Sequence, residues 1–390
     1  MTGEALPRVA DVVVIGAGVV GAACALALGQ AGLDVCVIDR AGPAAGSTSS
    51  GEGNLLVSDK LPGPELALAL HSLRLWREFA ARAGTPFEFD AKGGLVVASS
   101  SASLARLGTL VAEQRAAGVD ADLVAADELH EVEPMLAPDL LGGAYYRQDC
   151  QVQPMLATRA LLAEAGRAGV VVVGATEAVA AERGASGAIR AVRTSRGTVA
   201  TARVLVAAGA WSGDVARTLG GAVNVVPRRG HVVVTEPLPP LVRHKVYEAG
   251  YVDDVESDAA ALLSTAVVEG TENGPILLGS SRELVGFDSR LSGTAISMIA
   301  RGAAAMFPFL RDVRAIRAYL GFRPASPDHL PIIGEGEAGL WYATGHEGAG
   351  IGLAMGTADL IRALMLGDAP PLDPAAFSPM RPAVRRGRDG

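Results

Sequence analysis

Cysteine is scarce in this chain, and its scarcity bears on both chemistry and compartment. The 390 residues include 3 cysteines, Cys24, Cys36 and Cys150, whose spacing fits neither a metal site nor a redox pair. Cys24 and Cys36 stand in apolar segments, where we expect buried thiols. Nothing in this usage indicates an oxidising environment, so we expect a cytoplasmic protein.

Positive charge is limited as well. The formal net charge is −8 and the isoelectric point is near 5.4, which argues against a nucleic-acid partner and against binding to anionic lipid. One basic run occurs in the tail, residues 381–390, where we expect a solvated end. The 6 histidines are scattered and predict no metal cluster: His71, His130, His231, His244, His329 and His346.

A long uninterrupted apolar run is missing too, although 49% of the residues are hydrophobic. The most apolar stretch is "DVVVIGAGVVGAACALALGQAGLDVCVIDR", residues 11–40, and three glycines, Gln30 and Asp34 break it. A spanning helix needs about 20 consecutive apolar residues. A secretory signal needs a basic start, which the first ten residues do not offer. We therefore expect no membrane span.

The same stretch has the pattern of a βαβ unit. Residues 12–15 form a short β-branched run, which predicts a buried strand. Residues 22–30 are rich in alanine and leucine, which favour a helix. Residues 35–38 predict a second buried strand, and Asp39 follows it directly.

A Gly-x-Gly-x-x-Gly turn joins the first strand to the helix. Gly16 permits the tight turn, Gly18 lets a pyrophosphate approach the backbone, and Gly21 lets the helix pack closely on the strand. The start of the helix then offers free N–H groups to the phosphates. Asp39 stands where an acid accepts hydrogen bonds from a ribose. The unit predicts a dinucleotide site.

This unit alone leaves a nicotinamide and a flavin open, and later segments bear on the choice. Residues 41–54, "AGPAAGSTSSGEGN", are small and hydroxyl-rich and do not predict the next helix of a nicotinamide fold. They contact either a pyrophosphate or ribityl chain, or form a flexible loop. Further strands are expected at residues 170–173, 179–182, 189–194 and 203–207, followed by a turn at 209–212.

Two C-terminal segments complete the pattern. The first is "YLGFRPASPDHLPIIG", residues 319–334. The second is "GLWYATGHEGAGIGLAMGTADLI", residues 339–361, which predicts a strand, a second glycine-rich turn and a helix. The glycines of that turn leave the start of the helix open to a ligand.

In order and spacing, these motifs resemble the FAD-dependent oxidoreductases related to D-amino-acid oxidase, a family that includes glycine oxidase and the sarcosine oxidase β subunit. "GEGNLLVSDK" and "GSSRELVGFD" are similar to the flavin subunits of opine oxidase and D-hydroxyproline dehydrogenase, and less closely to the large subunit of hydrogen cyanide synthase. The resemblance implies an α/β fold, α+β overall. It implies a discontinuous Rossmann-like FAD domain, residues 1–90, 146–225 and 320–390, and an antiparallel-sheet substrate domain, residues 91–145 and 226–319, with helices over the flavin.

The resemblance also implies a set of cofactor-binding residues. FAD is expected to be non-covalent, because no cysteine follows Cys150 in the half of the chain where some sarcosine oxidases attach their flavin. The matching positions are Gly16, Gly18, Val19, Val20, Gly21, Asp39, Arg40, Thr48, Ser49, Gly53, Asn54, Leu55, Val179, Gly209, Trp211, Arg323, Gly345, His346, Glu347, Gly348, Ala349, Gly350 and Ile351.

For the substrate, Arg323 in "GFRP" matches the arginine that pairs with the carboxylate in amino-acid oxidases, a role that suits a planar guanidinium. Tyr247 and Tyr251 are candidates for a substrate-contacting tyrosine, and each is equally well explained as a core residue. Gly348 stands where glycine oxidase has a second arginine, which implies a more open or differently charged pocket.

The implied reaction is hydride transfer from the α-carbon of a neutral amine or amino acid to flavin N5, giving an imine. Oxygen remains open as the electron acceptor, as do a cyanide-synthase-like glycine dehydrogenase and partner subunits. We favour a dehydrogenase, because no lysine follows Lys245 and only Lys60 remains as a possible oxygen-activating exception. A non-catalytic flavoprotein is an alternative, but it would leave Arg323 without a role. An NAD(P)H-using reductase needs a second Gly-x-Gly-x-x-Gly unit, which we do not find.

Overall fold

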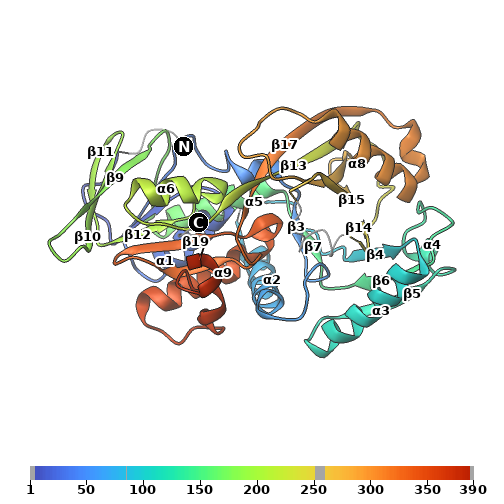
Figure 1. Ribbon diagram of the computed structural model, residues 1–390, viewed down its shortest axis with the longest axis horizontal. Coiled ribbons are helices and arrows are strands. Elements are labelled where there is room, and N and C mark those ends of the chain that lie inside the picture. Colours follow the sequence, from blue (N-terminus) through green and yellow to red (C-terminus); the bar gives the residue numbers. More distant parts are fainter. Residues whose placement is uncertain (1–4, 85, 251–259, 387–390) are drawn as a thin grey trace.

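The fold, seen in a computed structural model that describes residues 5–84, 86–250 and 260–386, has two main sheets in two lobes (Figure 1). The first sheet has six strands in the order β18-β19-β12-β1-β2-β8, and all neighbouring pairs except β18–β19 are parallel. Its strands are β1 (Val12–Ile15), β2 (Val35–Ile38), β8 (Val171–Val173), β12 (Arg203–Val206), β18 (Ile332–Glu335) and β19 (Leu340–Thr344).

Helices bury both the first sheet and one another. The parallel strands β1 and β2 are buried along their whole length, which explains their unbroken apolar sequences. Helix α1 packs against α5 and α9, and α2 packs against α9. The bounds are α1 (Val19–Gln30), α2 (Pro64–Arg82), α5 (Pro154–Arg167) and α9 (Gly350–Leu366). The predicted βαβ unit is present, with its helix beginning three residues earlier than expected, directly after Gly18.

A small antiparallel sheet lies beside the first one, in the order β11-β10-β9. It contains the predicted hairpin and one strand that was not predicted, β11. The short helix α6 packs on β9. The bounds are β9 (Ala178–Arg183), β10 (Ile189–Thr194), β11 (Gly197–Ala200) and α6 (Ser212–Thr218).

The second main sheet has eight strands, in the order β17-β13-β16-β15-β14-β4-β6-β5. It is antiparallel as predicted except for β14 and β4, which pair in parallel. The bounds are β4 (Gly94–Ala98), β5 (Ala121–Ala125), β6 (Gly142–Tyr146), β13 (Val226–Thr235), β14 (Lys245–Glu248), β15 (Leu263–Gly270), β16 (Ile276–Arg282) and β17 (Ala315–Ala325). Helix α8 (Gly293–Met306) packs on β13, β15 and β16, and α3 (Ser101–Ala116) packs on β4, β5 and β6.

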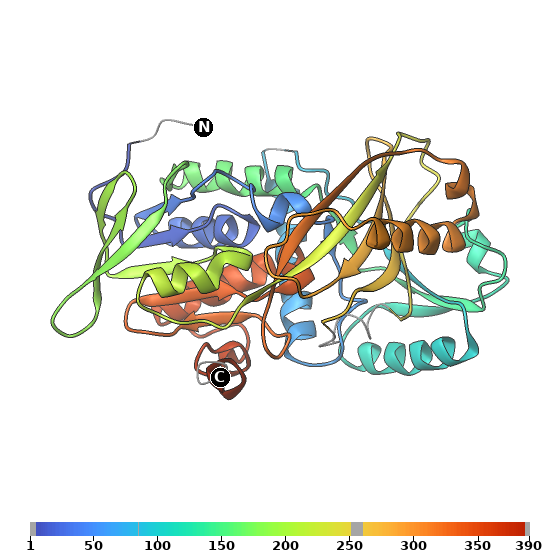
Figure 2. The same ribbon diagram turned by 45° about the horizontal axis from the view of Figure 1, so that its top comes forward.

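Two strands of this sheet cross the predicted domain boundaries. β6 continues past residue 145 and β17 past residue 320, because each pairs with its neighbours along its length. β13 and β17 are the longest of the paired strands, and Figure 2 shows them running together from the first lobe to the second. The short pair β3 (Asn54–Leu55) and β7 (Cys150–Gln151) makes a further connection. The exact division into domains stays a prediction.

One helix among the described residues, Glu347–Leu366, is long and apolar enough to span a membrane by length and composition alone. The sequence had led us to expect no such segment. In this fold 61% of the window is buried against other elements, as in a core helix.

Candidate functional site

A long cleft runs between the first sheet and the strands β13 and β17. Residues that directly follow the parallel strands β1, β2, β12 and β19 line it, so it lies at the carboxyl edge of the sheet, where α/β folds bind ligands. Residues of the loop between β2 and β3 line a further side, and residues of β13, β16 and β17 close the cleft opposite the first sheet. The sequence motifs that are far apart in the chain therefore meet here.

The start of α1 opens into the cleft as the glycine motif predicted. Gly16 has φ +113°, a conformation that side chains rarely adopt, and a Cβ atom at position 21 would overlap the carbonyl oxygen of Gly16. No side chain caps the helix at Gly18, and the N–H of Val19 donates to Oγ1 of Thr48 at 3.1 Å. Gly18, Val19 and Val20 line the cleft. The exposed helix start suits an anionic group.

Asp39 organises the turn after β2. Its Oδ2 accepts a hydrogen bond from the N–H of Ala17 at 2.9 Å, and its Oδ1 accepts from the N–H groups of Ala41 at 2.8 Å and Gly42 at 2.9 Å. The residue lines the cleft. Oδ2 accepts one of these bonds and retains a further acceptor site, so Asp39 is placed to accept from a ribose as well.

The end of the cleft beyond Asp39 is aromatic. The guanidinium of Arg40 lies over Trp211, 4.9 Å from the ring centroid, and Trp211 stacks on Phe287 at 5.3 Å. Arg40 and Trp211 line the cleft, as does Gly209. Val179 does not line the cleft and its side chain is 40% exposed, so the role that the resemblance implies for it, contact with the adenine through backbone groups, stays a prediction. The residues just before it, 176–178, do line the cleft, since the chain turns away where β9 begins.

Three other predicted cofactor residues face elsewhere. Ser49 donates its hydroxyl to the carbonyl oxygen of Gly46 at 3.1 Å and does not line the cleft. Gly53 lies against backbone, where a Cβ atom would overlap the carbonyl oxygen of Val152, and Leu55 is buried in the core. The side chains of Ser49 and Leu55 therefore do not reach the cleft, and the backbone role that the resemblance implies for Gly53 and Leu55 stays a prediction.

The second glycine-rich turn forms the floor of the cleft at the start of α9. His346, Glu347, Gly348, Gly350 and Ile351 line it, whereas Gly345 and Ala349 do not. The Nε2 atom of His346 is 3.0 Å from Oγ1 of Thr357. Burial lowers the pKa of His346 to about 3, so its imidazole is neutral at pH 7.

Glu347 holds this turn to neighbouring elements. It has φ +47°, which side chains rarely adopt. Its Oε2 accepts a hydrogen bond from Nη1 of Arg228 at 3.3 Å, and its Oε1 is 2.8 Å from Nδ1 of His329. These ion pairs fix the turn against β13 and the segment after β17.

Arg323 enters the cleft from β17. Its Nη1 donates to the carbonyl oxygen of Ser281 at 2.8 Å. A Cβ atom at position 230 would overlap the guanidinium, and a Cβ atom at position 348 would lie 3.5 Å from Nε. Glycine at position 230 therefore leaves the room that the arginine occupies, whereas a side chain at position 348 would begin in ordinary van der Waals contact with it.

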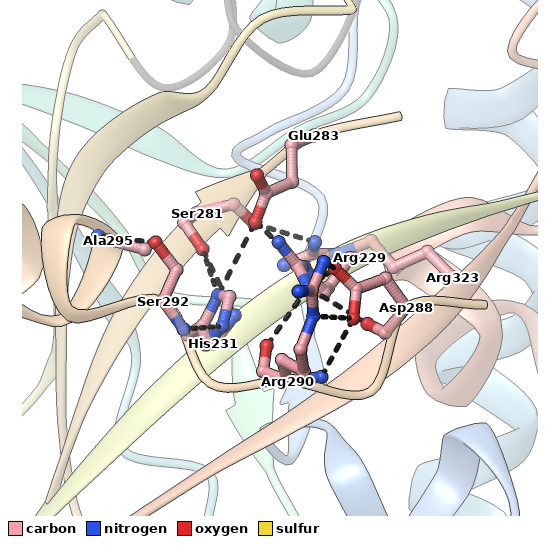
Figure 3. Close-up of polar contacts among 9 residues, drawn as sticks. All are labelled: Arg229, His231, Ser281, Glu283, Asp288, Arg290, Ser292, Ala295 and Arg323. Atoms are coloured by element: carbon pink, nitrogen blue, oxygen red, sulfur yellow. Dashed lines mark hydrogen bonds and ion pairs between the residues drawn. The ribbon is translucent and has the colours of Figure 1, made fainter. Parts of the chain in front are cut away.

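A polar network supports Arg323 from behind (Figure 3). Oγ of Ser281 is 3.1 Å from Nδ1 of His231, and Nε2 of His231 accepts from the N–H of Ser292 at 3.1 Å. Arg229 donates from Nε to Glu283 at 2.8 Å and pairs with Asp288 at 3.1 Å. These contacts tie β13, β16 and the start of α8 together, and β13 in turn pairs with β17, the strand that carries Arg323.

Comparison with known proteins decides which dinucleotide this cleft binds. Residues 11–364 match the family described as "DAO: FAD dependent oxidoreductase".

The chain belongs to this family of FAD-dependent oxidoreductases.

Individual relatives cover nearly the whole chain. It is 28% identical over 415 residues to hydrogen cyanide synthase subunit HcnC of Pseudomonas aeruginosa, with 95% of each protein covered. It is 27% identical over 377 residues to a glycine oxidase of Geobacillus kaustophilus, covering 94% of this chain and 96% of the relative. The crystal structure of glycine oxidase from Geobacillus kaustophilus matches with a TM-score of 0.86 at 26% identity, over 96% of this chain and 99% of that one. The predicted family and fold are confirmed.

The residues of the cleft fit FAD. The open helix start at Gly18 suits the pyrophosphate, and the remaining acceptor capacity of Asp39 suits the ribose. The loop between β2 and β3 and the turn at the start of α9 line the other end, where the resemblance in sequence implies the isoalloxazine. Among the described residues no group of acids, histidines and cysteines is arranged to hold a metal. All 3 cysteines are buried, and none of them lines the cleft.

Of the two tyrosines proposed for the substrate, Tyr247 lies outside the cleft. Its side chain is fully buried, and its hydroxyl donates to Oγ of Ser58 at 2.7 Å. It is therefore a core residue, because β14 lies between β15 and β4, away from the lining strands β13 and β17. Tyr251 lies outside the described residues.

Sequence reasoning also missed residues that line the cleft. Glu52 and Ser280 both face it, and so do Ser47 and Phe322. The signal for Glu52 was present in "GEGN", where an acid stands between two glycines of a loop already assigned to the flavin. The signal for Ser280 was weaker, because serine is common and only the position of β16 brings it to the cleft.

Proposed function

We propose that this protein oxidises the carbon–nitrogen bond of a carboxylate-bearing amine, an amino acid or an N-substituted amino acid. FAD supplies the oxidising chemistry by accepting a hydride, two electrons and a proton, from the α-carbon. The substrate loses an N–H proton as well and becomes an imine, which water hydrolyses. The residues of the chain bind and orient the substrate.

The observation that carries this proposal is the position of Arg323. Its guanidinium occupies space that Gly230 leaves open, and the Ser281 carbonyl holds one of its nitrogens. A planar guanidinium held in this way suits a carboxylate. The names of the glycine oxidase relatives agree with this assignment, since glycine is an amino acid.

Within this class we favour a dehydrogenase of the opine oxidase or D-hydroxyproline dehydrogenase kind, working with a separate electron acceptor or partner subunits. Support comes from the resemblance of "GEGNLLVSDK" and "GSSRELVGFD" and from the paired state of the lysines near the cleft. An oxygen-using glycine oxidase is the second candidate, supported by the glycine oxidase relatives. FAD is held without a covalent bond, since no cysteine lines the cleft among the described residues.

The test is an anaerobic screen of amines against the FAD-loaded protein, following the loss of oxidised-flavin absorbance. D- and L-amino acids, N-alkylglycines, hydroxyprolines and opines are each paired with the matching amine that lacks the carboxylate. We expect bleaching by members of the carboxylate set and much slower bleaching by their partners. Equal bleaching by the simple amines, or prompt bleaching by NADH, would contradict the proposal.

A further inference from the structure

Three residues that line the cleft each carry a buried polar side-chain atom with no hydrogen-bond partner among the described residues: Oε1 of Glu52, Oδ1 of Asn54 and Oγ of Ser280. The side chain of Glu52 is 7% exposed and Ser280 is 2% exposed. A buried polar atom left without a partner costs about 1–3 kcal/mol. Native proteins rarely carry three such atoms together unless a ligand satisfies them.

The chain holds the carboxylate of Glu52 in one orientation. Its Oε2 accepts hydrogen bonds from Nζ of Lys245 at 3.2 Å and from Nδ2 of Asn54 at 3.2 Å. Oε1 points instead toward Gly279, where a Cβ atom would overlap it. Since Nδ2 of Asn54 is engaged with Glu52, Oδ1 is the atom that Asn54 leaves available. The two free oxygens are both acceptors, so the missing group is a donor.

The charge around this site also favours a cation. Nζ of Lys245 is 2.6 Å from Oε2 of Glu269 and 3.2 Å from Oε2 of Glu52, so two carboxylates share one ammonium. The ammonium lies closer to Glu269, which does not line the cleft. The neighbouring Lys92 lies on the far side of Glu269, where its ammonium donates to the carbonyl oxygen of Gly270 at 2.7 Å. The carboxylate that faces the cleft is therefore incompletely neutralised.

The site stands close to Arg323 through a shared strand. Ser281 of β16 holds the guanidinium of Arg323 with its carbonyl oxygen, and Gly279, two residues earlier on β16, borders Oε1 of Glu52. The cleft thus presents the guanidinium of Arg323 and the carboxylate of Glu52 at neighbouring positions. A zwitterionic ligand, with a carboxylate at one end and an ammonium at the other, is complementary to this pair.

We propose that Glu52, with Asn54 and Ser280, forms a subsite for the charged nitrogen of the substrate, beside the carboxylate site of Arg323. The inference rests on the proposed function, because it assumes that the ligand in the cleft carries a carboxylate. It adds a requirement that the carboxylate site does not impose: a nitrogen with N–H donors that binds as a cation. This ammonium must lose one proton to water to become the neutral amine before the hydride leaves the α-carbon.

A matched pair of ligands tests the subsite without turnover. 2-Aminoisobutyrate and pivalate both carry a carboxylate and differ only in an ammonium in place of a methyl group, and neither has a hydrogen on the α-carbon to transfer. We expect calorimetry on the FAD-loaded protein to show 2-aminoisobutyrate binding at least about tenfold tighter than pivalate. Glu52→Gln should abolish this preference while leaving pivalate affinity unchanged.

Glu269→Gln is the matched control, because it removes a carboxylate from the same lysine at a position that does not line the cleft. It should keep most of the preference. Ser280→Ala, which leaves the ion pairs of Glu52 in place, should lose a smaller, severalfold part of it, and it serves as the test if Glu52→Gln does not fold. Arg323→Leu should weaken both ligands alike.

The proposal would be overturned if the parent protein bound 2-aminoisobutyrate no more tightly than pivalate, or if Glu52→Gln kept that preference. Equal losses of the preference in Glu52→Gln and Glu269→Gln would also overturn it. If Glu52→Gln does not fold, an unchanged preference in Ser280→Ala would overturn it. A fall in FAD affinity in Glu52→Gln with the preference intact would assign Glu52 to the cofactor instead. If Arg323→Leu bound both ligands as tightly as the parent, Arg323 would not be the carboxylate site, and the proposed function would be contradicted. The comparison of the parent with Glu52→Gln would still test the nitrogen subsite by itself.

Discussion

The guanidinium of Arg323 occupies the space that a side chain at Gly230 would fill. The two residues lie on paired strands, β17 and β13, so the strand pairing sets this contact. Since the obstructed atoms are the end of a flexible side chain, Gly230→Ala should fold and displace the arginine. We expect kcat/KM for carboxylate-bearing amines to fall about tenfold or more, with FAD occupancy unchanged.

Gly108→Ala is the control for this change. Gly108 lies in α3, and a Cβ atom there meets nothing within 4 Å. Unchanged kinetics in the control and a loss in Gly230→Ala would locate the effect at Arg323. Full activity in Gly230→Ala would show that the observed position of the guanidinium is not needed.

Arg323→Leu removes the guanidinium itself. A hydrogen bond to a charged group contributes about 1.5–3 kcal/mol, so kcat/KM should fall roughly 10-fold to 100-fold or more. Steady-state kinetics and bound-flavin absorbance measure the two effects separately. Arg317→Leu, on the exposed part of the same strand, should have little effect. Equal turnover in both variants would favour a simple amine as the substrate.

Asp39→Ala should weaken FAD binding by about tenfold or more. The carboxylate accepts backbone N–H groups from both sides of the cleft mouth, so its loss loosens the binding loop in addition to removing a ribose acceptor. Asp11→Ala is the control, since its carboxylate also accepts a backbone N–H, from Asp34, but does not line the cleft. Fluorescence titration of the apoprotein with FAD measures both, and equal dissociation constants would remove Asp39 from the site.

Asp149 should make stability depend on pH. Burial raises its pKa from 3.8 to about 7, although hydrogen bonds from Ser58 and Val57 oppose the shift. Because the folded pKa is above the unfolded one, the contribution is fully present below about pH 4 and is lost as the pH rises through about 7. Relative to Asp149→Asn, the parent should lose up to about 1.4 kcal/mol of unfolding free energy per pH unit in this window. Urea unfolding at pH 5 and pH 8 tests this, and parallel pH profiles would contradict it.

The reduced enzyme should react slowly with oxygen. Lys60 is buried and paired with Asp59 at 2.7 Å, and it does not line the cleft, while Lys245 is paired with Glu52 and Glu269. Neither therefore presents an uncompensated ammonium to the flavin, and arginine is a poor substitute for that compact charge. Stopped-flow mixing with air-saturated buffer measures the rate. Reoxidation that keeps pace with turnover and yields stoichiometric hydrogen peroxide would identify an oxidase.

The sequence by itself determined the βαβ unit, the open helix start at Gly18 and the position of Asp39. These features depend on local backbone geometry, because the turn needs positive φ at Gly16 and no side chain at Gly21, and neither depends on distant residues. The place of Arg323 beside the flavin end was also predicted, since a long motif of the family surrounds it.

Only the tertiary structure decided which side chains face the cleft elsewhere. Val179 and Tyr247 were both candidates for ligand contact, yet neither lines the cleft, because of where β9 begins and where β14 lies in the second sheet. Glu52 depends on Lys245 of another sheet for its orientation and on Gly279 for its room. Such a site is set by strand order and pairing across the whole chain, and no local pattern of residues carries that information.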